Sequence, residues 1–185
     1  MDNQLFIKYS LETIPKKWVK KLERSEHGNR YYTNTDNPFP LLCFIKFHTY
    51  TRVQVSIEIC GVDHPSLTLR FEVFHHLLST RYNSRICVKT SADEVTRISP
   101  VVNPFPSAGW WEREVWDMSG VSSLNHPDLR RISTDYGFDG HPLRKDFPLS
   151  GYSEVRYDDP EKRVVSEPIE MTQEFRYFDS ASPWD

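Results

Sequence analysis

Long apolar runs are the first feature that this sequence lacks. Its longest uninterrupted run is the five residues from Leu41 to Ile45, whereas a helix needs roughly 20 apolar residues to cross a bilayer. The first ten residues, MDNQLFIKYS, show neither a basic end followed by an apolar stretch nor an arginine-rich amphipathic pattern. We therefore expect a chain without a membrane span, which either is made where it works or has already lost a targeting signal.

Charge of one sign and cysteine are also scarce. The 23 basic and 26 acidic residues leave a net charge of −3, which gives no overall field that would attract nucleic acid or anionic lipid. Cys43, Cys60 and Cys87 have no paired spacing of the kind that holds zinc or an iron–sulfur cluster. We interpret them as small buried residues in a reducing compartment. Neither GxxxxGK[ST] nor GxGxxG occurs, so no phosphate-binding loop is indicated.

One α+β domain is predicted for the first two thirds of the chain. With 185 residues, the chain is long enough for one core and an appendage. Apolar residues at helical spacing predict helices over residues 11–24, 37–47 and 110–120. The second helix would begin with Asn37 as N-cap and Pro38 in its first turn, although its short apolar run is also compatible with a strand.

Alternating apolar and polar residues predict a small sheet. Residues 53–59 indicate a half-buried strand, residues 67–78 its antiparallel partner, and residues 83–91 a third strand. In the first strand, the alternation would direct four apolar side chains to the core, namely Val53, Val55, Ile57 and Ile59. We therefore predict a small mixed, largely antiparallel sheet with packed helices, and an α+β domain over residues 1–120.

The remainder of the chain is predicted to be an extended C-terminal arm. Residues 125–185 contain six prolines and no sustained periodicity, so no further regular element is predicted. Aromatic residues nevertheless recur, which is unusual for a disordered tail. Ordering a long segment without a core costs conformational entropy that one small domain cannot offset with spare apolar surface. We therefore predict that residues 121–185 dock on partner subunits, over more than the standard interface of about 1,600 Å².

The histidines do not indicate a metal site. His126 and His141 are far apart in the sequence without a matching third ligand, and each precedes a proline. His75 and His76 are adjacent in a predicted strand, so their side chains point to opposite faces and cannot share an ion. We therefore expect no metal ligands in this chain.

The segment HPDLRRISTDYGFDGHPLRKDFPLSG, residues 126–151, together with the acidic residues of the preceding predicted helix, allows three functions. A free-standing, metal-independent hydrolase would use Glu114, Asp117 and His126 as acid–base groups. A single-stranded RNA-binding module would use the aromatic and basic side chains of the segment. Its interleaved acidic residues favour a protein surface instead, where arginine pairs with carboxylates across an interface. We expect a clamp on another subunit and no catalytic residue.

Several short motifs resemble one known family. They are ERExxD from Glu112, HPDLRRI from His126, TDYGF from Thr134, GHPLRKDFPL from Gly140, EVRYDD from Glu154 and a closing QEFRYFDxxSPW. Together they closely resemble the thirty-kilodalton subunit of respiratory complex I, NADH:ubiquinone oxidoreductase. The size of the chain and its first residues look like the plant form that is encoded in the mitochondrion.

The resemblance implies a small α+β domain with an extended arm in a hetero-oligomer. It implies a non-catalytic scaffold in the peripheral arm, on the matrix side of the mitochondrial inner membrane. The implied partners are the subunit that forms much of the quinone pocket and the neighbouring iron–sulfur subunits, with no nucleic acid. The complex uses FMN, iron–sulfur clusters and ubiquinone, and this chain is expected to hold none of them.

The predicted docking residues lie in these motifs and bind no cofactor or metal. Acidic and basic side chains would form ion pairs, and aromatic side chains would be apolar anchors. The residues are Glu112, Arg113, Glu114, Asp117, His126, Asp128, Arg130, Arg131, Asp135, Tyr136, Phe138, His141, Arg144, Lys145, Asp146, Phe147, Phe175 and Trp184.

Four residues depart from the family pattern. Ser119 and Ser123 stand where the family usually has large apolar residues, Ser180 has a similarly aromatic setting, and His64 replaces a usual tyrosine. Our hypothesis is that the sequence is an unedited translation of an organellar message, because C-to-U editing changes such codons to Phe, Leu or Tyr. The alternative is that packing against partners tolerates small residues there.

Overall fold

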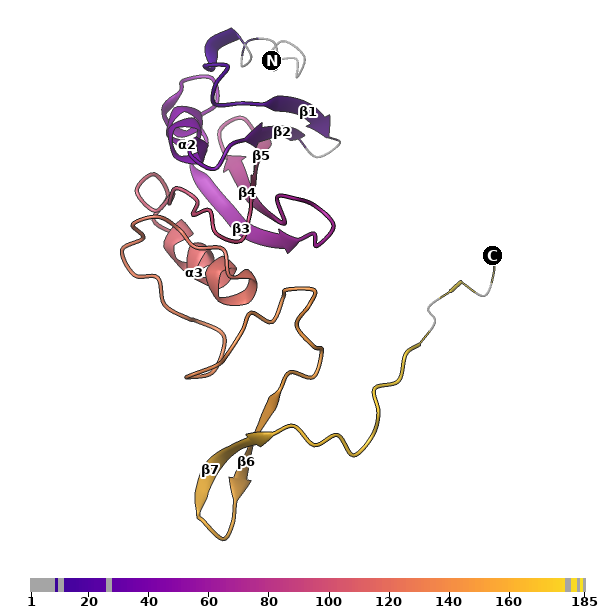
Figure 1. Cartoon of the computed structure of the whole chain (residues 1–185). Helices are drawn as coiled ribbons and strands as arrows, with labels where there is room; N and C mark the ends of the chain where they lie inside the picture. The colour runs from indigo at the N-terminus through magenta and orange to yellow at the C-terminus, as the bar shows by residue number, and fades with distance from the viewer. Residues whose placement is uncertain (1–8, 10–11, 26–27, 179–180, 183, 185) are drawn as a thin grey trace. The chain divides into compact units, whose positions relative to one another are not determined.

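The chain divides into two compact units, residues 1–147 and residues 148–185. The computed structural model describes residues 9, 12–25, 28–178, 181–182 and 184. Within these residues, the first unit contains a five-stranded sheet and two helices, and the second contains a two-stranded hairpin (Figure 1). The compact first unit thus extends past the predicted domain boundary at residue 120, and a separate docking role for residues 121–147 stays a prediction.

The first unit is built on a mixed sheet with the strand order β1-β2-β5-β4-β3. Its strands are β1 Lys21–Ser25, β2 Gly28–Thr33, β3 Val55–Asp63, β4 Phe71–Ser79 and β5 Ser84–Ala92. Neighbouring strands are antiparallel except β2 and β5, which are parallel. The predicted α+β class and largely antiparallel sheet are confirmed, although β1 and β2 have no counterpart among the predicted strands.

Two helices complete the first unit, α2 over Pro38–Phe47 and α3 over Ala108–Ser119. Both were predicted, and the alternative of a strand at residues 41–45 is wrong. Asn37 precedes α2 as expected, but its side-chain amide donates to the Lys17 carbonyl oxygen and does not cap the helix. None of the described helices has both the length and the apolar character needed to cross a membrane.

The sheet has a core face and an open face. The core face joins both helices in one apolar cluster that includes Tyr31, Leu41, Ile45, Ile59, Phe71, Leu77, Val88 and Val115. Side chains that alternate with these point the other way and remain half-buried or exposed, among them Tyr32, Glu58, Cys60, Phe74, His76, Cys87 and Lys89. His75 is buried and its neighbour His76 is half-exposed, so the prediction that they point to opposite faces is confirmed.

The helix predicted over residues 11–24 is wrong. Only a short helical turn precedes Pro15, and Lys21–Ser25 pair with β2 as strand β1. A proline inside a helix lacks the N–H donor and clashes with the preceding turn. The spacing nevertheless identified residues that contact the core, since Ile14 is buried and Trp18 packs against the apolar cluster. Leu11, the first residue of the predicted stripe, lies outside the described residues.

A β-bulge in β3 changes the predicted burial. The register shifts between Ser56 and Glu58, so Ser56 is buried whereas Val55 and Ile57 are exposed. The alternating pattern predicted that Val55 and Ile57 are buried, because it assumes an uninterrupted strand ladder. A bulge inserts one residue and so moves neighbouring side chains to the other face of the sheet. Beyond the bulge, Ile59 is buried as predicted.

The second unit is a hairpin with almost no buried surface. Strands β6, Ser153–Asp158, and β7, Arg163–Pro168, pair antiparallel, although no regular element was predicted here. Large apolar residues are exposed throughout the described part of the unit, namely Leu149, Tyr152, Val155, Tyr157, Val164, Met171, Phe175, Tyr177, Phe178 and Trp184. An isolated two-stranded hairpin is at best marginally stable in water, and the described part of this unit adds little apolar burial to its strand pairing.

Candidate docking site around helix α3

Helix α3 packs closely on β3 (Figure 1) and carries four of the predicted docking residues, Glu112, Arg113, Glu114 and Asp117. Gly61 makes the close approach possible, because a Cβ atom there would lie 2.9 Å from the Ser119 hydroxyl and 3.3 Å from Val115. Val115 faces the core. Polar residues on other sides of α3, such as Arg113 and Asp117, contact the loops that follow the helix.

Asp117 holds one turn of the following loop. Its carboxylate is fully buried and accepts hydrogen bonds from the backbone amides of residues 132–134 at 3.1, 2.8 and 3.0 Å. The Thr134 hydroxyl donates at 2.7 Å and Arg131 at 2.9 Å. Burial raises the pKa of Asp117, but these hydrogen bonds outweigh burial and hold the pKa well below its usual range. Such a carboxylate is a poor proton acceptor near neutral pH.

Arg113, one turn earlier in α3, holds the same loop from the donor side. Its guanidinium donates to the carbonyl oxygens of Arg130 and Arg131 at 3.1 and 3.2 Å and lies 5.2 Å from the centre of the Trp110 ring. Arginine has only donors, which suits carbonyl groups that lack another partner. The arginine and the aspartate of the ERExxD motif therefore bind the main chain of their own protein.

A later segment caps the C-terminal end of α3. The last carbonyl groups of a helix have no partner within it, and here three consecutive ones are satisfied from outside. The contacts, all 2.9 Å, join His141 Nδ1 to the Asp117 oxygen, the Leu143 amide to the Met118 oxygen and Arg144 Nε to the Ser119 oxygen. Because a carbonyl oxygen only accepts, His141 carries its proton on Nδ1.

Gly120 makes room for this cap. Its φ of 79° is left-handed, and its amide closes the helix by donating to the Trp116 carbonyl oxygen at 2.8 Å. A Cβ atom at this position would collide with the Arg144 guanidinium and would lie 2.7 Å from the His141 ring. Glycine is required here for its backbone conformation and for space.

An ion-pair network ties the end of the first unit to the sheet. Asp63 accepts two hydrogen bonds from Arg70, at 2.6 and 2.7 Å, and one from the Lys145 amide at 2.8 Å. Arg70 also contacts Asp146 at 3.0 Å. The Arg70 guanidinium holds the pKa of Asp63 below its usual value. Sequence analysis missed Asp63 and Arg70, and their only signal is a pair of opposite charges that flank the turn between β3 and β4.

Glu112 and His126 form a buried pair beside the core. Glu112 Oε2 lies 3.5 Å from His126 Nε2, and their side chains are only 5% and 2% exposed. The Asp128 amide donates to His126 Nδ1 at 3.1 Å, so the neutral ring carries its proton on Nε2, facing Glu112. Burial raises the pKa of Glu112 to about 7 and lowers the pKa of His126. Both shifts favour the neutral forms.

A small cavity of about 20 Å³ lies next to Glu112, which is enough for one water molecule. Its lining is mostly apolar but includes His75 and Ser123. Both ring nitrogens of His75 are buried without a hydrogen-bond partner among the described residues, and burial lowers the pKa of His75 to about 4. The imidazole is therefore neutral at physiological pH.

The structure separates the predicted docking residues into two groups. One group makes buried or half-buried contacts within the first unit, namely Glu112, Arg113, Asp117, His126, Arg131, Phe138, His141, Arg144 and Phe147. The other group is exposed, namely Glu114, Asp128, Arg130, Asp135, Tyr136, Lys145, Asp146, Phe175 and Trp184. A docking role for either group stays a prediction, and the second group presents more of its side-chain surface to solvent than the first.

The alternative functions find little support in this arrangement. For a hydrolase, Glu114 is exposed while Asp117 and His126 are held in separate buried contacts, so the three do not form an acid–base site. For an RNA-binding surface, Arg131 and Arg144 are already paired with carboxylates of the first unit. What the geometry does form is a polar clamp around α3 that orders residues 126–147.

Comparison with known proteins assigns the chain to a family. Residues 31–153 match the family model described as "Respiratory-chain NADH dehydrogenase, 30 Kd subunit". The chain belongs to this subunit family. Full-length relatives agree, since the chain is 81% identical to the Arabidopsis thaliana protein named NADH dehydrogenase [ubiquinone] iron-sulfur protein 3, and covers 97% of it. The resemblance seen in the motifs is confirmed.

More distant relatives in the family are similar over the same length. The Marchantia polymorpha protein of that name is 68% identical over 185 residues, and the chain covers 94% of it. The Prototheca wickerhamii protein named NADH-ubiquinone oxidoreductase subunit 9 is 52% identical over 183 residues, and 95% of it is covered. One solved chain, from the membrane-bound sulfane sulfur reductase, has a TM-score of 0.62 at 22% identity over 80% of this chain and 87% of its own. That structure supports the fold.

The residues that depart from the family pattern have different surroundings. Ser119 is 2% exposed against Gly61, so a large side chain there would need the helix or the strand to move. Ser123 lines the cavity, where a larger side chain has more room. His64 is half-exposed and lies 3.2 Å from Glu72, and Ser180 lies outside the described residues. RNA editing stays a hypothesis, and serine at residues 119 and 123 in peptide mass spectra of the mature protein would contradict it.

Proposed function

We propose that this chain is a non-catalytic scaffold subunit of respiratory NADH dehydrogenase, complex I. Its family and its full-length relatives support membership of that enzyme. The oxidoreductase activity belongs to the assembled complex, whose FMN, iron–sulfur clusters and ubiquinone are expected to lie in other subunits. In this proposal, the first unit is a rigid body and the second unit docks on neighbouring subunits.

The observation that carries the docking role is the exposed apolar surface of the second unit. In the hairpin, Val155, Tyr157 and Val164 are 56%, 57% and 65% exposed. A monomeric soluble protein rarely exposes a contiguous apolar surface of this kind, and such a surface marks an interaction site. Strands β6 and β7 have only each other as partners in the described structure, so a neighbouring subunit would supply the missing core.

The α3 clamp supports a second, polar contact with a partner. Tyr136 is fully exposed in the segment that follows the turn held by Asp117, and Arg130, which precedes that turn, is exposed as well. Tyrosine and arginine are enriched among residues that dominate binding energy. Because the clamp fixes the loop before binding, less conformational entropy is lost when a partner docks.

The family suggests which partners these surfaces meet. We propose the subunit that forms the quinone pocket and the adjacent iron–sulfur subunits, in the peripheral arm on the matrix side of the mitochondrial inner membrane. Exposed acidic, basic and aromatic residues near α3 fit a mixed protein interface better than a lipid surface, which would select a basic patch. Cross-linking of the assembled complex followed by mass spectrometry tests these partners, and cross-links from the second unit to other subunits alone would contradict them.

The test is a double substitution in the hairpin, Tyr157→Ser with Val164→Ser. We expect assembled complex to fall at least tenfold on native gels, because the substitutions remove apolar contact area from the interface. The thermal unfolding of the first unit is expected to be unchanged. Val95→Ser is the matched control, since Val95 is 87% exposed in the first unit and is not among the proposed docking residues. Normal complex abundance in the double variant would overturn the docking role.

A further inference from the structure

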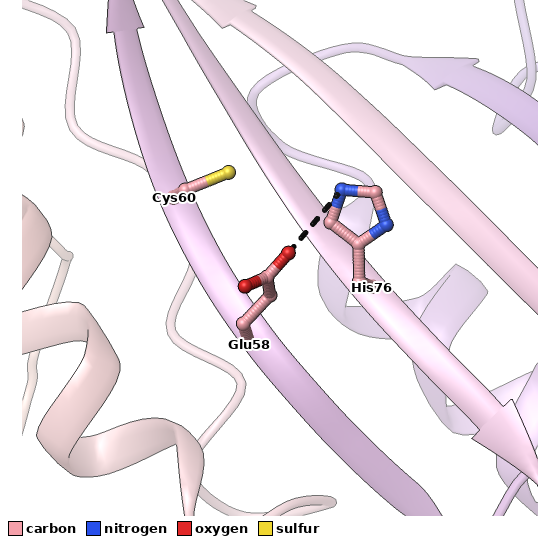
Figure 2. Close-up of side chains that lie close together, drawn as sticks. All are labelled: Glu58, Cys60 and His76. Atoms are coloured by element: carbon pink, nitrogen blue, oxygen red, sulfur yellow. Dashed lines mark ion pairs between the residues drawn. The ribbon is translucent and has the colours of Figure 1, made fainter.

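Three different metal-binding side chains meet on the open face of the sheet. Glu58 and Cys60 are two residues apart on β3, so both point to that face, and Glu58 is paired in register with His76 on β4. Figure 2 shows the carboxylate, the thiol and the imidazole projecting to the same side of the two strands. One ligand atom from each lies within 4.8 Å of the others. The Glu58 Oε1 atom is 3.9 Å from His76 Nε2.

The donor set selects among metal ions. Sulfur and imidazole nitrogen suit zinc and similar borderline divalent ions, whereas magnesium and calcium prefer oxygen ligands alone. Zinc lies about 2.0–2.3 Å from such ligands, so the three atoms have to close by roughly 1 Å around an ion. The side chains of Glu58 and His76 are 50% and 38% exposed, which leaves them room to rotate inward.

Neighbouring residues that the structure describes orient the His76 ring and do not pair with the Glu58 carboxylate. His76 stacks against Phe74 with an interplanar angle of 12° and a centroid distance of 6.4 Å, which orients the imidazole. Lys89, a cation on the same face, pairs with Glu72 at 2.7 Å and lies over the Phe74 ring. Among the described residues, Glu58 therefore forms no ion pair with a lysine or arginine that an incoming ion would have to displace.

We propose that Glu58, Cys60 and His76 form a binding site for a zinc-type divalent cation, with water as the fourth ligand. Three protein ligands with one open position are a common arrangement for zinc. The thiolate and the carboxylate together balance the charge of the ion, and the neutral imidazole adds a third ligand. This site is separate from α3 and does not depend on the proposed assembly role.

Binding is accompanied by loss of a proton. In the free protein, burial raises the pKa of Cys60 and the nearby Glu58 carboxylate raises it further, so the thiol is protonated near neutral pH. When the ion binds, the S–H bond breaks, a metal–sulfur bond forms and the proton passes to solvent. No oxidation or reduction takes part.

The sequence does not reveal this site because its ligands are not spaced as a motif. Glu58 and Cys60 lie well before His76 in the sequence, and only the antiparallel register of β3 and β4 brings them together. We expected no metal ligands because we considered only the spacing of residues along the chain. That spacing does not show which residues are neighbours on adjacent strands.

Cobalt titration of the purified full chain tests the site. Co²⁺ replaces zinc in sites of this kind and gives a thiolate charge-transfer band when sulfur is bound. We expect one equivalent of Co²⁺ to produce this band and Zn²⁺ to abolish it by displacement. Cys60→Ser is expected to remove the band, and Glu58→Gln and His76→Gln to weaken binding at least tenfold. Zn²⁺ is also expected to slow alkylation of Cys60, measured by peptide mass spectrometry.

Matched variants keep the test specific. Cys43→Ser removes a thiol of α2, and His64→Gln removes a half-exposed histidine that lies beside Glu72, so both are expected to leave cobalt binding unchanged. Absence of the band in the natural chain overturns the proposal. So does a band that survives in Cys60→Ser, or one that is lost in Cys87→Ser instead, because the ion would then use other ligands. Unchanged circular dichroism shows that each variant is folded.

Discussion

The two units of the chain use polar and apolar residues in opposite ways. In the first unit, charged residues around α3 are buried and satisfied by the same chain, as Asp117 and Arg113 illustrate. In the second unit, apolar side chains such as Tyr157 and Val164 are exposed. Part of the charged motifs that look like contacts with another protein therefore stabilises the first unit itself, whereas the large apolar side chains of the described hairpin remain exposed.

The largest effect is expected from removing the buried carboxylate of the clamp. Asp117→Ala leaves the amides of residues 132–134 without their acceptor and Arg131 without its carboxylate partner, and the loss of such a buried charged group costs about 3–5 kcal/mol. Urea denaturation of the full chain measures the change in the free energy of unfolding. Asp128→Ala is the control, since its exposed carboxylate pairs with Arg130 at the surface. Equal losses in both variants would contradict a structural role for the clamp.

A somewhat smaller effect, dependent on pH, is expected at Glu112. Burial raises its pKa to about 7 from the usual 4.5, so the folded state binds a proton that the unfolded chain has released. The stabilisation is fully present below about pH 4.5 and is lost as the pH rises through 7, by on the order of 3 kcal/mol. Glu112→Gln keeps a neutral side chain that accepts from the Val101 amide, so it should lose less stability than the natural chain between pH 5 and pH 8.

The control for this pH dependence is Glu114→Gln. Glu114 is exposed on the same helix, so its variant should follow the natural chain. The lowered pKa of His126 makes the free energy of unfolding rise with pH, opposite to the effect of Glu112. The natural chain and both variants share this contribution. Parallel stability curves for Glu112→Gln and the natural chain would show that Glu112 is ionised in the folded state.

A third effect, of about 1–2 kcal/mol from backbone strain, is expected for Gly120→Ala. Its left-handed φ of 79° disfavours a side chain, and the new Cβ atom would also displace Arg144 from the end of α3. Gly137→Ala separates the two causes, because Gly137 has a φ of 68° but no atom within 4 Å of a Cβ. Thermal unfolding should show a larger loss for Gly120→Ala. The same loss in both would mean that the contact with Arg144 contributes nothing.

The smallest effect is expected in the second unit. Val164→Ala, at a side chain 65% exposed, should change the stability of the free chain by less than about 0.5 kcal/mol. Val88→Ala removes a fully buried side chain from the core face and should cost several times as much, because it leaves a cavity. Similar values from chemical denaturation would mean that the hairpin has a core of its own.

Sequence patterns predicted the elements that have strong local signals. The helix after Asn37 and the three strands with alternating apolar residues were found because local spacing alone specifies which side chains are buried. Strands β1 and β2 were missed because KLERS and GNRYYT contain few apolar residues, and their pairing depends on distant partners. The hairpin of the second unit was missed for a similar reason, since all its strand positions but a few are exposed.

The sequence indicated which residues belong to the candidate site but not which groups they contact. The motifs led us to predict that Glu112, Arg113 and Asp117 dock on a partner, and the structure shows that all three also make buried contacts within the first unit. No pattern in the sequence says whether a buried carboxylate meets the amides of its own chain or those of a partner. That choice depends on the path of residues 126–147 around α3, which only tertiary packing defines.

The parallel pairing of β2 with β5 has a consequence for synthesis of the chain. Tyr31 lies beside Val88 in that ladder, so the centre of the sheet joins segments that leave the ribosome at well-separated times. Strands β1 and β2 cannot join the rest of the sheet until β5, which ends at Ala92, has been synthesised. Strand pairs between segments far apart in the sequence form slowly. We therefore expect a chaperone to increase the yield of folded chain most while the strands before β5 are exposed and unpaired.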